Sequence, residues 1–101
     1  MSTVYKIEQI KEKLIPIFNA EPIYKAVLFG SYATGEATEI SDVDIVIDSH
    51  GELVNMHFYG VLEDIVQALN KKVDLIDIVE IHPNSPILDE IQKKGVLLYE
   101  K

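Results

Sequence analysis

The chain has 101 residues, about half of them apolar, no cysteine, and a formal net charge of −8 at pH 7. This length and composition predict one folded domain, residues 1–101, and exclude a disulfide framework or a cysteine-built zinc site. The negative charge disfavours direct binding of nucleic acid, because phosphate backbones are held by clustered cations. The N-terminus lacks a continuous apolar signal segment, and no apolar run reaches membrane-spanning length. We therefore expect a cytoplasmic protein that does not enter the membrane.

Apolar residues recur at helical spacing near the N-terminus. The pattern predicts an amphipathic helix that starts near Ser2 or Thr3 and ends before Pro22. Pro16 is expected to kink this helix or to end it early, because proline removes a backbone donor and clashes with the preceding turn.

Three apolar runs in the middle of the chain predict strands. They are Lys25–Gly30, Asp42–Asp48 and Val73–Ile78. A short helix is expected after the first strand, from Ser31, and a longer amphipathic helix is expected after the second, over Leu53–Asn70.

The C-terminal segment predicts one more short helix. Ser85 is an N-cap followed by a proline at the first helical position, and Gly95 ends the helix after two lysines. The last residues, Gly95–Tyr99, form either a final short strand or an extended tail. The alternation of helices and strands predicts one α/β domain with helices packed on a sheet.

A Gly-Ser turn and an Asp-x-Asp pair carry the chemistry of the chain. Gly30-Ser31 follows the first strand, and after ten intervening residues Asp42-Val43-Asp44 opens the second. Strand side chains alternate between faces, so Asp42 and Asp44 point the same way, about 7 Å apart. Hard carboxylate oxygens suit magnesium, and the amides and hydroxyl of the turn suit a phosphate oxygen. A phosphate-binding turn beside a metal-binding pair of acids is what nucleotidyl transfer requires.

A further candidate for metal binding is an acid on the third expected strand, Asp74. Asp74 lies inside an apolar run, where an acid is costly unless it finds a cation or hydrogen bonds. Asp77 competes for this role but lies on the opposite strand face from Asp74. Asp48 shares the face of Asp42 and Asp44 but is best explained as the polar end of its strand.

The combined motif resembles the minimal nucleotidyltransferases, which are small members of the DNA polymerase β-like nucleotidyltransferase superfamily. Their pattern is Gly-Ser, ten residues, Asp-x-Asp, and a third carboxylate on a later strand. The positions that match it here are Gly30, Ser31, Asp42, Asp44 and Asp74. The resemblance covers most of the chain. It implies an α/β (α+β) nucleotidyltransferase fold, with a mixed β-sheet flanked by helices.

The resemblance also implies roles for these residues. Gly30 would let the backbone approach the phosphates of ATP, the substrate, and Ser31 would donate to them. Asp42 and Asp44 would hold two Mg²⁺ ions, and Asp74 would bind the ion on the acceptor side and take the proton of the acceptor hydroxyl.

Stand-alone members of this family are typically antitoxins whose partner is a HEPN-domain ribonuclease toxin. The resemblance therefore implies a hetero-oligomer in which AMP is transferred from ATP to a tyrosine of the toxin. Two alternatives stay open. One is a binding module that acts by occlusion. It is favoured because Thr34 stands where many relatives carry arginine, and the chain has no arginine elsewhere to hold phosphate. The other is one subunit of a small-molecule nucleotidyltransferase of the aminoglycoside type.

Overall fold

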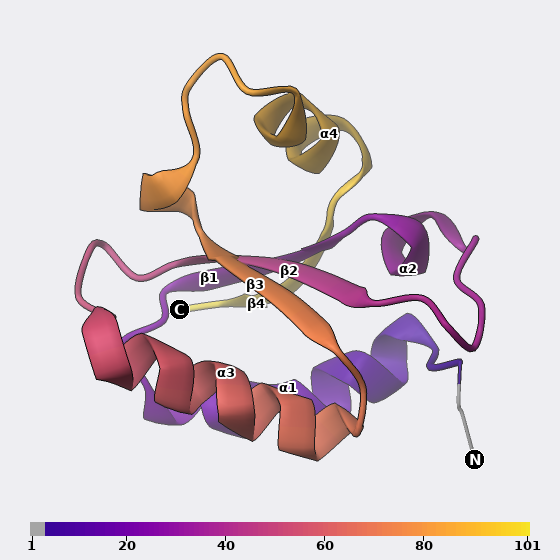
Figure 1. Ribbon diagram of the computed structural model, residues 1–101, viewed down its shortest axis with the longest axis horizontal. Helices are drawn as coiled ribbons and strands as arrows, with labels where there is room; N and C mark the ends of the chain where they lie inside the picture. Colours follow the sequence, from indigo (N-terminus) through magenta and orange to yellow (C-terminus); the bar gives the residue numbers. More distant parts are fainter. Residues whose placement is uncertain (1–3) are drawn as a thin grey trace.

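The computed structural model describes residues 4–101, which form a four-stranded sheet with helices on both faces (Figure 1). In chain order the elements are α1 (Ile7–Ala20), β1 (Lys25–Phe29), α2 (Ser31–Thr34), β2 (Val43–Asp48), α3 (Asn55–Leu69), β3 (Val73–Asp77), the 3₁₀ turn η1 (Ile78–Glu80), α4 (Pro86–Lys94) and β4 (Val96–Glu100). The strand order is β3-β2-β1-β4, with β1 antiparallel to β2 and β4, and β2 parallel to β3. The expected mixed sheet is confirmed, and the C-terminal tail is its strand β4.

The N-terminal helix begins later than the sequence predicts. The expected start near Ser2 or Thr3 lies outside the described residues, and the helix begins at Ile7. The three described residues before it are not helical.

A kink or an early end is expected at Pro16; the early end does not occur, because α1 continues to Ala20. Proline removes only its own backbone donor, and the neighbouring turns are held by tertiary packing. Leu14 and Phe18, on either side of Pro16, are both fully buried in the core. Burial of these two large side chains outweighs the loss of one helical hydrogen bond.

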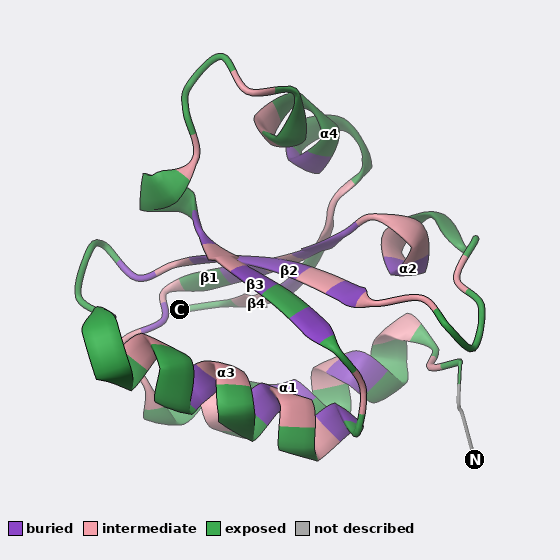
Figure 2. Cartoon of the chain, in the orientation of Figure 1, coloured by how far each residue is buried: buried purple, intermediate pink, exposed green. Residues whose placement is uncertain are grey.

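The main core lies between the sheet and the layer formed by α1 and α3, where Figure 2 shows buried positions on the inner faces of both helices. The strands supply alternate residues and the helices supply residues three or four apart, as the two periodicities require. The buried set includes Ile10, Leu14 and Phe18 of α1, Val43, Ile45 and Ile47 of β2, and Val61, Ile65 and Leu69 of α3. None of the helices in residues 4–101 is long and apolar enough to cross a bilayer.

The other face of the sheet is covered in part by α4 (Figure 1). Ile91 of α4 joins Phe29 and Val46 in a second, smaller apolar cluster. Gly95, which follows α4, lies so close to β1 that an added Cβ would be 2.7 Å from Cγ1 of Val27. Glycine at this position therefore allows α4 to sit tightly on the sheet before the chain turns into β4.

Candidate active site

The pairing of the strands brings two of the predicted acids together. Asp44 on β2 lies opposite Phe29 of β1 on one side and opposite Asp74 of β3 on the other. Because β2 and β3 are parallel and in register, Asp44 and Asp74 share one sheet face, the face that α4 partly covers. β2 starts at Val43, so Asp42 lies just before the strand and not inside it.

The carboxyl group of Asp44 has an unusual environment. Its pKa is raised to about 6, first because the group is partly buried, and then because of the charge of Asp74 and a hydrogen bond with it. The charges of Asp42 and Glu90 raise this pKa further. Mutual repulsion among acids held at one place favours a bound cation, because a cation would remove the cost of ionising all of them.

Gly30 of the predicted phosphate turn lies directly against Asp44. Its backbone has φ 73° and ψ −154°, a conformation that residues with a side chain rarely adopt. A Cβ built on Gly30 would overlap Oδ2 of Asp44 and lie 3.2 Å from its Cγ. Only glycine fits this position, so the turn and the acid are side by side.

Ser31 follows as the first residue of the short helix α2. The carbonyl oxygen of Gly30 accepts hydrogen bonds from the backbone N–H groups of Ala33 at 3.1 Å and Thr34 at 3.3 Å, which closes the turn. The hydroxyl of Thr34 donates to Glu36 Oε1 at 2.7 Å. Thr34 therefore builds the turn, and its short side chain offers no guanidinium to a phosphate.

Asp42 forms an ion pair with Lys72, whose Nζ lies 3.8 Å from Asp42 Oδ2. Both side chains are open to solvent, so this pair contributes little to stability. Within residues 4–101 no three acids or histidines are gathered as a ready metal cage.

Magnesium does not need such a cage. It is usually held by one or two carboxylates together with phosphate oxygens and waters. The hard oxygen donors of Asp44 and Asp74, with Asp42 beside them, fit this mode of binding.

Asp77, the competing acid on β3, has a structural role. It is 4% exposed and accepts hydrogen bonds from Oγ of Ser49 at 2.5 Å and from the N–H of Val79 at 3.3 Å. Its partner Ser49 is fully buried and in turn accepts from the N–H of Leu53 at 3.2 Å. Asp77 therefore faces away from Asp44 and Asp74, as strand alternation predicts.

Glu90 of α4 is a site residue that the sequence does not reveal. It belongs to no motif and lies in an ordinary amphipathic helix. Its neighbour Ile91 packs on Phe29 and Val46, and this packing brings Glu90 near enough for its charge to raise the pKa of Asp44.

A mixed sheet with a glycine turn and paired acids on one face is the arrangement of the nucleotidyltransferase fold. Residues 12–101 match the family described as "Polymerase beta, Nucleotidyltransferase". The chain belongs to this family, so the resemblance predicted from the sequence is confirmed.

Similar proteins include a candidate protein adenylyltransferase of Methanocaldococcus jannaschii. The two are 34% identical over 77 residues, which are 76% of this chain and 83% of the relative. A chain in the crystal structure of a toxin–antitoxin complex with AMP-PNP has a TM-score of 0.75 and 26% identity, covering 90% of this chain and 73% of that one. A chain from the complex of the tri-AMPylated Shewanella oneidensis HEPN toxin with its MNT antitoxin shares the fold, with a TM-score of 0.70, 22% identity and coverage of 94% and 73%.

Proposed function

We propose that this chain is the antitoxin of a toxin–antitoxin pair and transfers AMP from ATP to a tyrosine hydroxyl of a HEPN-domain ribonuclease toxin. The observation that carries the proposal is the Asp44–Asp74 pair, held against Gly30 on one face of the sheet. The relative named as a candidate protein adenylyltransferase, and the similar complexes with AMP-PNP and with a tri-AMPylated toxin, support it.

The reaction is an in-line attack of the tyrosine oxygen on the α-phosphorus of ATP. The new oxygen–phosphorus bond forms as the bond to the β-phosphate bridging oxygen breaks, and pyrophosphate leaves. Asp42, Asp44 and Asp74 would hold two Mg²⁺ ions, which supply stabilisation of the charge that develops on the phosphate and leaving oxygens. Asp74 takes the proton of the hydroxyl, and Gly30 and Ser31 bind the phosphates.

The charge of the chain fits such a partner. A protein of net charge −8 attracts a basic protein, and an RNA-cleaving toxin needs a basic surface. We therefore infer a hetero-oligomer in the cytoplasm, with no direct contact between this chain and nucleic acid or membrane.

The alternative of inhibition by occlusion is favoured by one observation: the hydroxyl of Thr34 bonds within the turn, and the chain has no arginine to hold the phosphates. The third possibility is transfer to a small molecule. These three functions differ in where the α-phosphate of ATP ends: on a protein, on a small molecule, or still in ATP.

A labelling experiment separates them. The purified chain is incubated with Mg²⁺, α-labelled ATP and lysate of its source cells, beside the variants Asp44→Asn and Asp77→Asn. Adenylylation predicts label on one protein band, absent with Asp44→Asn and retained with Asp77→Asn. Label on a small molecule would favour the aminoglycoside type, and no transfer by a chain that still captures its partner would favour occlusion.

A further inference from the structure

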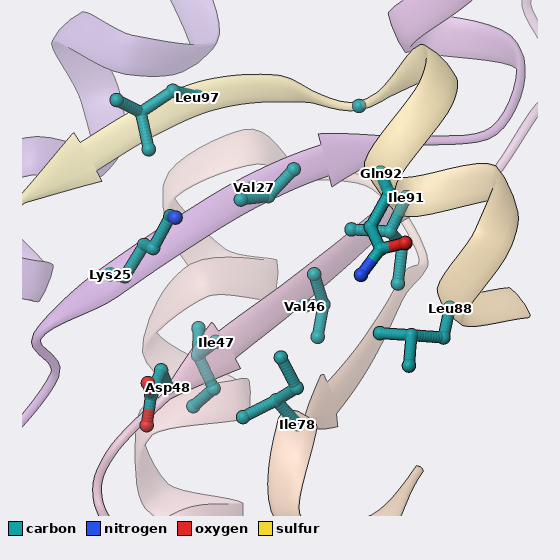
Figure 3. Close-up of a pocket in the computed structure, with 11 residues that line it drawn as sticks. Lys25, Val27, Val46, Ile47, Asp48, Ile78, Leu88, Ile91, Gln92 and Leu97 are labelled. Carbon is teal, nitrogen blue, oxygen red and sulfur yellow. The ribbon is translucent and has the colours of Figure 1, made fainter. Parts of the chain in front are cut away.

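An apolar groove of about 400 Å³ lies on the sheet face that carries the acids (Figure 3). Its volume is within the range of about 300–1,000 Å³ that is usual for binding pockets. Apolar side chains from five elements of the fold line it: Val27 of β1, Val46 of β2, Ile78 of η1, Leu88 and Ile91 of α4, and Leu97 of β4. Lys25 and Asp48 lie together at the end away from α4, and Gln92 lies on the α4 side.

The lining of the groove is unusually open for an apolar surface. Leu97 is 44% exposed and Ile78 is 37% exposed. Leu88 is also only partly buried. Contiguous exposed apolar side chains of this kind mark binding surfaces in soluble proteins.

Two rows of side chains connect the groove with the acids. On β2, Asp44 and Val46 are alternate residues on the same face, and on β3 the same holds for Asp74 and Ile76. Ile78 of η1 follows β3 and lines the groove. At about 3.3 Å per residue, the groove lies on the order of 10 Å from the acids.

Helix α4 lies between the groove and the acids. Ile91 packs over Val46, while its neighbour Glu90 acts on Asp44. The groove is therefore a separate recess next to the reaction centre and not part of it. A single extended polypeptide of about three to five residues spans this distance.

The position of the phosphate turn decides which substrate the groove can serve. Gly30 contacts Asp44 directly, whereas no residue of α2 lines the groove. In the proposed reaction the triphosphate lies at Gly30 and Ser31, so the groove is left for the other substrate. Its apolar lining and the net charge of −8 fit an apolar side chain presented by a basic protein.

We propose that this groove anchors the acceptor protein, by binding one apolar side chain that lies about three to five residues from the tyrosine that receives AMP. The inference rests on the proposed function and adds the recognition element for its protein substrate. The anchor places the hydroxyl at the acids, and most of its binding energy comes from burying the apolar side chain.

The test uses two groove variants, Leu97→Lys and Leu88→Lys, and the matched variant Ile15→Lys. Ile15 is 41% exposed on α1, on the other face of the sheet. The protein that accepts the label is purified, and KM is measured for it and for ATP with each variant. Thermal unfolding of each variant verifies that it folds. Leu97→Lys should disturb the fold less than Leu88→Lys, because Leu97 is exposed on an edge strand.

The inference predicts that both groove variants raise KM for the acceptor protein about tenfold or more, the loss expected from one buried apolar side chain. KM for ATP should stay within a factor of about two, and Ile15→Lys should behave as the unmodified chain.

An unchanged acceptor KM in folded groove variants would overturn the inference and leave the proposed function standing. A rise in KM for ATP in its place would assign the groove to the nucleoside and also overturn it. If the unmodified chain transfers AMP to no protein, the proposed function fails, and this inference fails with it.

Discussion

Substitution of Gly30 by alanine tests the contact between the phosphate turn and the acids. The new Cβ would overlap Oδ2 of Asp44 and lie 3.2 Å from its Cγ, so the carboxylate must move. The backbone at φ 73° and ψ −154° adds strain of about 1–3 kcal/mol for a residue with a side chain. Each kcal/mol lowers Tm by about 4–8 °C in a domain of this size.

The substitution should also slow catalysis. A displacement of a catalytic group by about 1 Å can cost about 100-fold in rate, and we expect a loss of this order for Gly30→Ala. The assay is the initial rate of AMP transfer to the acceptor protein, measured below the Tm of every variant.

Gly51→Ala is the matched control for this experiment. Gly51 also has a positive φ, 77°, but nothing lies within 4 Å of the position of its Cβ. We expect this variant to lose stability through strain and to keep its rate. Transfer by Gly30→Ala within a few-fold of the rate of Gly51→Ala would refute the placement of the turn against the catalytic acid.

Three further predictions concern single side chains. The raised pKa of Asp44, about 6, means that the folded protein binds this proton more tightly than the unfolded chain does, so the stability that it contributes below about pH 4 is lost as pH rises through 6. Asp44→Asn should therefore raise Tm relative to the unmodified chain at about pH 7.5 and not at about pH 4, in thermal melts without magnesium, and an equal effect at both values would contradict the assignment. Ser49→Ala leaves the buried carboxylate of Asp77 without its hydroxyl donor and should lower the free energy of unfolding in urea by about 1–3 kcal/mol. The rate of AMP transfer should be retained at low temperature. A large loss of rate in the folded variant would place Asp77 in catalysis. Ser31→Ala should raise KM for ATP by about 10- to 100-fold, the value of a hydrogen bond to a charged group, and steady-state kinetics showing no change would remove Ser31 from the phosphate site.

Local sequence patterns predict most of this fold and the centre of the site. The alternation of strand side chains predicts the shared face of Asp42 and Asp44, and the apolar run around Asp74 marks it as costly without a partner. Strand pairing then brings Asp44 and Asp74 into register. The sequence cannot give this register, because it depends on how β2 and β3 align in the sheet.

Features that depend on tertiary packing escape sequence reasoning. Pro16 is tolerated inside α1 because Leu14 and Phe18 are buried beside it. Glu90 acts on Asp44 only because α4 packs on the sheet through Ile91. The groove next to α4 also arises from this packing and has no motif of its own.

The most direct test of the proposed function is the intact mass of the partner protein after reaction with ATP and Mg²⁺. The unmodified chain should add whole AMP units to the partner, located at tyrosine by fragmentation, and should silence its ribonuclease activity. Asp44→Asn and Asp74→Asn should leave the mass unchanged and the ribonuclease active. A partner that is silenced at its unmodified mass, equally well by these variants, would contradict adenylylation and show that the chain acts by binding alone.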